Sequence, residues 1–230
     1  MNKVQHTVLI PFFNEEKTLE VALTNLISED FADEIILIND GSIDSSSKIA
    51  EKLNKKYKNV NLINSHQNRG KGHALRLGIN IANGEFIGVL DADLEYSPKD
   101  LKKLFEKINK ENLEIVCGSR FIGNSIRKNV YLRTYLANKI LSNFFSKIYK
   151  CNVTDVATCL KVFKNQIIKD IKFESEGFSI EVELLAKTIK KSNKYHEYPI
   201  EYFARTYEEG KKIKFKDGIR YFIAILKYRN

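Results

Sequence analysis

The chain has 230 residues, of which 43% are hydrophobic and 29% charged, and its formal net charge is +9. This length suits one globular domain with a sizeable core, because no Pro-, Gly- or Ser-rich stretch divides the chain. The three cysteines lack metal-ligand spacing and argue against a disulfide framework. No apolar run is long enough for a membrane-spanning helix or a signal peptide. We therefore expect a cytoplasmic protein.

The first half of the chain alternates β-branched apolar runs with helical patterns. These predict strands over residues 7–12, 34–39, 60–64, 86–90 and 114–117, and helices over 15–27, 45–56, 71–82 and 99–111. The less regular second half predicts helices over 132–147 and 180–191 and strands over 160–163 and 195–200. Such alternation predicts an α/β fold with a mostly parallel sheet flanked by helices, whose ligands bind beyond the carboxyl ends of the strands.

Two acidic residues, Asp91 and Asp93, close the predicted strand at 86–90. Carboxylate oxygens at the carboxyl end of a strand can hold Mg2+ or Mn2+ and leave positions on the metal open for phosphate oxygens. A solvated acidic turn is the other interpretation of an isolated Asp-x-Asp pattern. The motifs around it have to decide between the two.

Polar motifs also follow other predicted strands. The first strand is followed by neither a dinucleotide-binding nor a P-loop pattern. Asp40, before Gly41, could accept the ring N–H of a nucleobase, although a plain turn has the same pattern. Gly70 and Lys71 open a predicted helix, where free backbone N–H groups and a cation could seat an anion. Arg120 ends the fifth strand in a similar way, and each of these cations taken alone could simply be solvated.

The positive charge is concentrated near the C-terminus, where residues 205–230 hold eight basic and three acidic side chains. Apolar residues recur there at helical spacing between the basic ones: Phe215, Ile219, Phe222, Ile223 and Leu226. This pattern is typical of an interfacial amphipathic helix and equally of a helix that packs on a core. The basic excess indicates an anionic partner such as phosphates, lipid headgroups or nucleic acid.

Six motifs in this order resemble the family-2 glycosyltransferases, and most closely the polyprenyl-phosphate (dolichyl-phosphate) glucosyl- and mannosyltransferases. They are Pro11-x-x-Asn14-Glu15, Asn39-Asp40-Gly41-Ser42, Asn68-Arg69-Gly70-Lys71-Gly72, Asp91-Ala92-Asp93-Leu94, Gly118-Ser119-Arg120 and Asp155-x-x-Thr158. The resemblance continues through Glu181-x-Glu183-Leu184-Leu185 and Arg205-x-x-x-Glu209-Gly210-Lys211-Lys212-Ile213, so it covers nearly the whole chain.

The resemblance implies a GT-A fold, which is a Rossmann-like, mostly parallel sheet flanked by helices in a single domain. Residues 1–204 would form this domain, with 1–118 as the nucleotide-sugar-binding half and 119–204 as the acceptor half. Residues 205–230 would form a basic amphipathic C-terminal extension.

The resemblance also implies roles for individual residues. Asp40 would contact the nucleobase, while Asp91 and Asp93 would serve the ribose, the diphosphate and its Mg2+ or Mn2+, with Glu95 as a further candidate metal ligand. The full nucleotide-sugar-binding set is Pro11, Asn14, Glu15, Asp40, Gly70, Lys71, Asp91, Ala92 and Asp93. Candidates for gripping the donor diphosphate or the acceptor phosphate are Arg120, Arg133, Arg205 and Lys212, because a cation such as the planar guanidinium of arginine suits phosphate oxygens.

The implied function is metal-dependent, inverting transfer of a hexose from a nucleotide sugar, UDP-glucose-like rather than GDP-linked, to a polyprenyl phosphate. Asp93, Asp155 and Arg120 are the catalytic candidates. A lipid phosphate is already anionic near neutral pH and needs no strong base. In the alternative, extension of a capsule, O-antigen or other glycan, a sugar hydroxyl would need a base, and Asp155 is the candidate.

The sequence departs from the family pattern in two places. Cys159 stands where the family usually has glycine; a positive φ there would cost a cysteine about 1 kcal/mol or more, so we expect ordinary backbone geometry. The chain also lacks the pair of C-terminal transmembrane helices of many bacterial relatives. We therefore expect a protein that docks peripherally on the inner face of the cytoplasmic membrane.

Two other classes of protein fit less well. A nucleic-acid-binding module would explain the basic tail but has no use for Asp91 and Asp93, so we expect no nucleic-acid partner. A sugar-phosphate nucleotidyltransferase shares the broad fold, but the Gly-rich activating loop expected after its first strand is absent.

Overall fold

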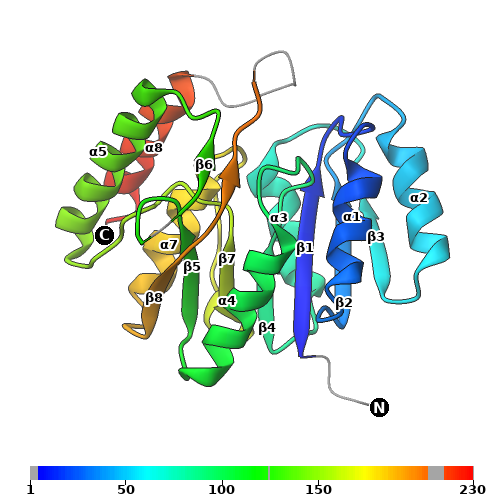
Figure 1. Cartoon of the computed structure of the whole chain (residues 1–230), viewed down its shortest axis with the longest axis horizontal. Helices are drawn as coiled ribbons and strands as arrows, with labels where there is room; N and C mark the ends of the chain where they lie inside the picture. Colours follow the sequence, from blue (N-terminus) through cyan, green and yellow to red (C-terminus); the bar gives the residue numbers. More distant parts are fainter. Residues whose placement is uncertain (1–4, 124, 207–214, 230) are drawn as a thin grey trace.

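The computed structural model describes residues 5–123, 125–206 and 215–229. Its central sheet has seven strands in the order β3-β2-β1-β4-β7-β5-β8 (Figure 1). Their bounds are β1 His6–Phe12, β2 Glu34–Asn39, β3 Val60–Asn64, β4 Phe86–Val89, β5 Ile115–Ser119, β7 Lys161–Lys164 and β8 Tyr195–Pro199. Within this sheet, β7 runs antiparallel to both its neighbours, and every other pairing is parallel. The predicted mostly parallel sheet is confirmed.

Helices cover both faces of the sheet. Their bounds are α1 Leu19–Ser28, α2 Ser46–Lys56, α3 Lys71–Ile81, α4 Pro98–Lys110, α5 Leu132–Tyr149, α6 Asn165–Ile168, α7 Ile180–Ile189 and α8 Phe215–Lys227. The helices α1, α2 and α4 pack on one face, whereas α3, α5, α6, α7 and α8 pack on the other. All six residues of β2 are buried, as expected for a strand covered on both sides.

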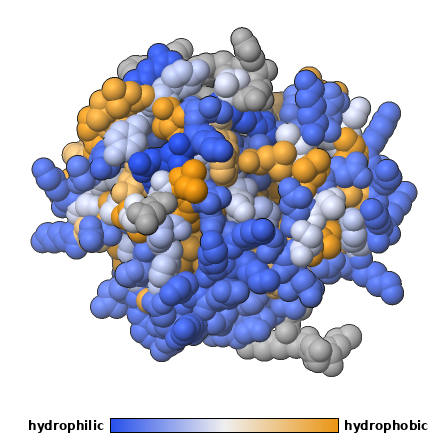
Figure 2. All heavy atoms as spheres, viewed as in Figure 1, coloured by the Kyte–Doolittle hydropathy of each residue, from blue (hydrophilic) through white to orange (hydrophobic). Residues whose placement is uncertain are grey.

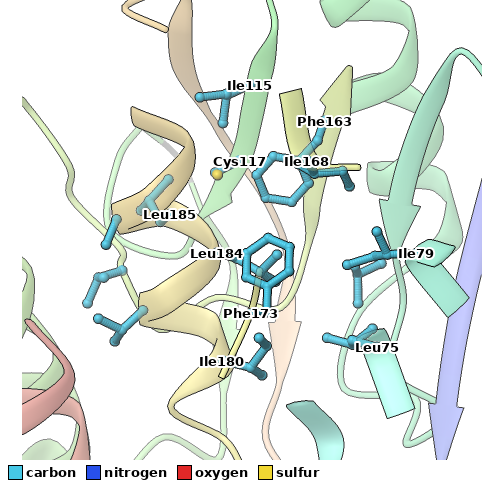
Figure 3. Packing of buried hydrophobic residues seen from close by; sticks show 14 of the residues in the cluster. Leu75, Ile79, Ile115, Cys117, Phe163, Ile168, Phe173, Ile180, Leu184 and Leu185 are labelled. Atoms are coloured by element: carbon cyan, nitrogen blue, oxygen red, sulfur yellow. The ribbon is translucent and has the colours of Figure 1, made fainter. Parts of the chain in front are cut away.

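Interlocking apolar side chains fill the layer beneath α7. Figure 3 shows Cys117 of β5 and Phe163 of β7 facing Leu184 and Leu185 of α7, with Ile79 of α3 lying across from them. All three cysteines described by the structure are free thiols. This core extends without a break from the strands of the first half of the chain to those of the second.

The order of the strands places a crevice at one end of the sheet. From β1 the chain builds β2 and β3 on one side and then returns to form β4 on the other. Where the order of strand addition reverses in this way, a crevice opens between β1 and β4 at their carboxyl ends, and ligands of α/β proteins bind in such crevices. The segments that follow β1 and β4 hold the first motif and the aspartate pair, so both meet at this crevice.

The boundary predicted at residue 118 falls inside β5, and both predicted halves share one sheet. The C-terminal segment is also joined to the domain, because α8 packs against α5 and α7. Its buried face consists of Tyr221, Ala224, Ile225 and Tyr228. The predicted apolar stripe lies on the opposite, exposed face, at Ile219, Phe222, Ile223 and Leu226, while the side chain of Phe215 is outside the described residues.

Most predicted elements match the structure within two residues. The largest difference is at α1, predicted from residue 15 but beginning at Leu19, because residues 15–18 form a turn in which the carbonyl of Glu15 accepts the N–H groups of Thr18 and Leu19. The sequence did not predict α6 or the two-stranded ribbon of β6 (Arg127–Lys128) and β9 (Tyr202–Phe203). Cys159 has ordinary φ, as expected. Among the described helices, none has the length and hydropathy needed to span a bilayer.

Candidate active site

A cavity of about 360 Å3 opens at the carboxyl ends of β1 and β4. Several predicted site residues line it, namely Pro11, Glu15, Asp40, Gly70, Lys71, Asp91, Ala92, Asp93, Glu95, Arg120 and Arg205. A cavity of this size accommodates a small organic ligand. The fold therefore brings together predicted site residues that are up to 194 positions apart, from Pro11 to Arg205.

The ammonium of Lys71 is bound between two carboxylates in the cavity. Its Nζ lies 2.6 and 2.8 Å from the two oxygens of Asp91 and 2.8 Å from Oε1 of Glu181. The other oxygen of Glu181 lies 2.5 Å from Nζ of Lys161, which is fully buried. Burial alone would lower the pKa of Lys71, but the adjacent Asp91 and Glu181 carboxylates raise it well above its usual value.

Asp93 lies in the cavity beside two other carboxylates. Its Oδ1 accepts the backbone N–H of Glu95 at 3.0 Å. Burial, together with the nearby carboxylates of Asp91 and Glu95, raises the pKa of Asp93 to about 8. A divalent cation bound at this edge would relieve that repulsion.

Asp40 holds the loop that precedes α3. Its two oxygens accept the backbone N–H groups of Arg69 at 3.1 Å and Gly70 at 2.6 Å. The N–H groups of Gly72 and of the next residue donate to the carbonyl of Glu176. These four N–H groups are therefore already paired within the protein, so the anion seat predicted from free backbone N–H groups is wrong for them, and Lys71 offers its side chain instead.

Arg120 and Asp155 form a buried, two-pronged ion pair. Nε and Nη2 of Arg120 donate to the two carboxylate oxygens at 2.6 and 2.7 Å, and its backbone N–H donates to the same group at 3.0 Å. Burial opposes the charged guanidinium, yet Asp155 raises the pKa of Arg120 well above its usual value. The guanidinium also lies over the ring of Tyr202, 4.8 Å from its centroid.

Asp155 itself is fully buried and does not line the cavity. A general base needs a carboxylate oxygen that can reach the proton of its substrate. Both oxygens of Asp155 are instead occupied by Arg120. The geometry therefore argues against the predicted role of Asp155 as a base and favours a role in holding Arg120.

The remaining predicted phosphate ligands differ in position. Arg205 lies in the cavity, where it pairs with Glu15 at 2.8 Å and donates to the carbonyl of Asp93 at 2.7 Å. Arg133 is exposed on α5 and does not line the cavity. Lys212 lies outside the described residues. Asn14, also absent from the cavity lining, adopts a left-handed φ of 52° and accepts the N–H of residue 43, so it shapes the turn after β1.

Sequence reasoning missed several residues that line the cavity or lie directly beneath it. Lys161 had a signal, because a lysine that opens an apolar strand in the middle of a sheet needs a buried partner. Glu181 belongs to the motif Glu181-x-Glu183-Leu184-Leu185, for which the resemblance implies no individual role. Tyr96, Tyr202 and Tyr221 line the cavity, and nothing in their local sequence distinguishes them from ordinary core tyrosines.

The model of one protein family, glycosyl transferase family 2, matches residues 7–172. The chain belongs to this family. This family-2 glycosyltransferase is 31% and 33% identical to two uncharacterised proteins of Methanocaldococcus jannaschii, over 84% and 87% of its length and 90% and 82% of theirs. It is 30% identical to the human dolichyl-phosphate beta-glucosyltransferase, over 81% of its own length and 64% of the human protein's. The predicted resemblance to the glycosyltransferase family is confirmed.

Solved structures support the same fold. Glucosyl-3-phosphoglycerate synthase from Mycobacterium tuberculosis, crystallised with Mn2+, UDP and glucosyl-3-phosphoglycerate, superposes with a TM-score of 0.74. The superposition covers 97% of this chain and 79% of that one at 16% identity. A second crystal structure of that enzyme contains Mg2+ and UDP, with the same TM-score and 18% identity. The GT-A fold expected for this family-2 glycosyltransferase is confirmed.

The side chains of this glycosyltransferase fit a divalent metal at Asp91 and Asp93, and Glu95 stays a predicted ligand. Both oxygens of Glu95 accept hydrogen bonds, from the hydroxyl of Tyr202 at 2.8 Å and from the backbone N–H of Arg205 at 2.7 Å. Within the described ranges, no group of three or more His, Cys, Asp or Glu side chains converges on a possible metal position. Phosphate oxygens of a substrate would complete the shell of a hard cation held by Asp91 and Asp93.

Proposed function

We propose that this family-2 glycosyltransferase transfers a hexose from a UDP-sugar to a polyprenyl phosphate, with Mg2+ or Mn2+, at the inner face of the cytoplasmic membrane. One observation carries the proposal. The cavity that is lined by Asp91 and Asp93 is also lined by Tyr221 of α8, a helix whose outer face is apolar and basic. A phosphate that is attached to a lipid on that outer face could enter beside the donor.

The donor side of the proposal rests on charge and on the relatives. Asp91 and Asp93 would hold the metal, which when bound would neutralise the departing diphosphate. Arg120, Arg205 and Lys71 line the same cavity and would bind phosphate oxygens. The human relative is a dolichyl-phosphate beta-glucosyltransferase, and the mycobacterial enzyme was crystallised with UDP and a metal, which favours a UDP-sugar donor.

The choice of acceptor depends on whether the carboxylate of Asp155 is available as a base. Because Arg120 occupies both its oxygens, the cavity has no free carboxylate at this position to activate a sugar hydroxyl. A phosphate acceptor needs no such base near neutral pH. The ion pair therefore favours a polyprenyl phosphate over the alternative, a glycan acceptor that uses Asp155 as its base.

The membrane side of the proposal rests on a surface formed by α5 and α8, which we call the α5–α8 face. The two helices lie side by side, and the rings of Phe144 and Phe222 are 5.5 Å apart (Figure 1). Seven exposed large apolar residues lie on it: Leu132, Leu136, Ile140, Ile219, Phe222, Ile223 and Leu226. Figure 2 shows apolar side chains gathered over these helices, at the upper left of the molecule.

The charge of the α5–α8 face also suits anionic lipid. Helix α5 contains basic residues and no acidic residue, and the one acidic residue of α8, Asp217, is buried. Basic side chains near an anionic leaflet contribute about 1 kcal/mol each, and exposed apolar side chains insert among the acyl chains. We propose that this face rests on the membrane.

Transfer itself is tested by incubating the protein with radiolabelled UDP-glucose, Mn2+ and undecaprenyl phosphate, and by counting the label extracted into organic solvent. We expect label in the organic phase, and its loss in EDTA. Parallel reactions receive soluble oligosaccharides or UDP-glucose alone. Label that reaches only the oligosaccharides, or organic label that persists in EDTA, would contradict the proposal.

Membrane docking is tested by flotation with vesicles that contain phosphatidylglycerol. Leu136→Glu and Ile223→Glu place a charge on the α5–α8 face and should reduce the floated fraction at least fivefold. Val21→Glu on α1 is the matched control, because Val21 is 47% exposed and Leu136 is 49% exposed. Equal flotation of all three variants would contradict docking through this face.

A further inference from the structure

Four charged side chains of alternating sign run from the cavity into the core of the protein. Asp91, at the cavity end, contacts Lys71 through both its oxygens, at 2.6 and 2.8 Å. Lys71 also contacts Glu181 at 2.8 Å, and Glu181 contacts Lys161 at 2.5 Å. The side chain of Asp91 is 21% exposed, whereas those of Glu181 and Lys161 are 3% and 0% exposed. The row is neutral as a whole, as buried ions have to be.

Lys71 occupies the part of Asp91 that a metal would need. A divalent cation binds to carboxylate oxygens, and both oxygens of Asp91 already face the ammonium of Lys71. A metal and Lys71 therefore compete for the same carboxylate. Both cations can be accommodated if the ammonium of Lys71 pairs with another anion, such as a diphosphate, when a metal binds Asp91.

The backbone around Lys71 is fixed, so such a change is confined to its side chain. The N–H of Gly70 donates to Asp40 and the N–H of Gly72 donates to the carbonyl of Glu176. At Gly72, an added Cβ would lie 2.1 Å from the carbonyl oxygen of Ser175, which leaves the backbone no room to shift toward that loop. The flexible four-carbon stem of lysine can still turn its ammonium through a few ångströms.

We infer that Lys71 is a resident cation, which neutralises Asp91 in the empty enzyme and turns to the donor diphosphate when the metal takes Asp91. Glu181 is the positioning residue of this exchange, because it keeps hold of Lys71 in both states. Lys161 is fully buried and fixes Glu181 in turn. The inference rests on the proposed function, since it requires a diphosphate and a metal in this cavity.

The exchange predicts that removing the charge of Lys71 and removing the charge of Glu181 have opposite effects on the affinity for the metal. Without the charge of Lys71, Asp91 is free, so the empty protein should bind Mn2+ more tightly while UDP binds more weakly. Without the charge of Glu181, Lys71 pairs with Asp91 alone, so Mn2+ should bind more weakly. Each effect should be about tenfold for a charge removed at contact distance in a partly solvated site.

The first test is a titration of the protein with Mn2+ alone, in which electron paramagnetic resonance measures the free ion. The second is a calorimetric titration with UDP in saturating Mn2+. The variants are Lys71→Met and Glu181→Gln. Glu183→Gln is the matched control, because Glu183 is also buried on α7 and pairs with Lys187 at 2.6 Å, but it does not line the cavity. Its melting temperature should fall while Mn2+ and UDP affinities stay within twofold of wild type.

Glu181→Gln leaves Lys161 without its ion-pair partner and could misfold. It is therefore compared with the double variant Glu181→Gln/Lys161→Met, which keeps the row neutral by removing one charge of each sign. We expect the same weakening of Mn2+ binding in both. Lys71→Met with unchanged or weaker Mn2+ affinity would overturn the inference, as would Glu181→Gln and its double variant behaving like Glu183→Gln. Failure of the wild-type protein to bind UDP with Mn2+ would instead reject the proposed function.

Discussion

The ion pair between Arg120 and Asp155 makes a strong prediction about stability. Its two N–H···O contacts are 2.6 and 2.7 Å long, and its side chains are 8% and 0% exposed. Removing one member of such a pair leaves an uncompensated charge in a medium of low polarity, which typically destabilises a protein by about 3–5 kcal/mol. We expect Asp155→Asn to lower the free energy of unfolding by about that amount, because the guanidinium of Arg120 stays buried.

The assay is guanidinium chloride unfolding in EDTA, followed by circular dichroism, together with the thermal midpoint. A loss of this size corresponds to a fall in Tm of roughly 6–20 °C for a domain of this length. Lys107→Met is the control, because it breaks an ion pair to Glu111 whose side chains are 40% and 37% exposed, and it should cost at most about 1 kcal/mol.

A second variant separates the structural role of the pair from catalysis. Arg120→Met/Asp155→Leu removes both charges and should recover most of the lost stability, since well-packed apolar groups can replace a buried ion pair. It should not recover transfer activity, because Arg120 lines the cavity. If Asp155→Asn cost less than about 1 kcal/mol and instead abolished the acidic limb of the pH–rate profile, the reasoning would be refuted and the base role restored.

Two further predictions concern β4 and the loop that follows it. The pKa of Asp93 is raised to about 8, so the folded state holds its proton more tightly than the unfolded state and that contribution to stability is lost as the pH rises through about 8. Because this loss begins near the ordinary aspartate pKa of 3.8 and is complete above about 8, Asp93→Asn should melt higher than wild type in EDTA by a larger margin at pH 9 than at pH 5. A gain that is equal at both pH values would contradict this. Gly88→Ala should cost roughly 1–3 kcal/mol in denaturant unfolding, because its Cβ would lie 2.6 Å from the ring of Phe105, and Phe105→Leu in the same background should restore part of it. An unchanged midpoint would show that α4 can move away from β4.

Much of the fold could be predicted because periodicity and strand-end motifs are local properties. The continuous apolar runs at 34–39 and 86–90 report strands covered on both faces, and β2 and β4 match them closely. The short elements β6, β9 and α6 were missed, since two to four residues show no period. The start of α1 was misplaced because residues 15–18, which fit a helical pattern, form a turn that the carbonyl of Glu15 closes.

The site was only partly predictable, because a motif names residues without saying which of them bind each other. Asp91, Asp93 and Arg205 do meet in one cavity. The sequence could not reveal that Arg120 binds Asp155 or that Glu95 is held by Tyr202, since 35 and 107 positions separate these partners. Such long-range pairs decide whether a carboxylate is available to a metal or a substrate.

The reversed direction of β7 determines which part of the chain reaches the cavity. In a parallel sheet, the loops that lead into strands lie at the end opposite to the ligand. Because β7 runs the other way, with Lys161 opposite Val89 of β4 and Cys117 of β5, its entrance lies at the ligand end. The loop 150–160 is thereby delivered to the cavity, with Ala157 and Cys159 in its wall. Insertions or substitutions in this one loop can remodel its wall of the cavity while the parallel strands β1, β2 and β4 keep their geometry.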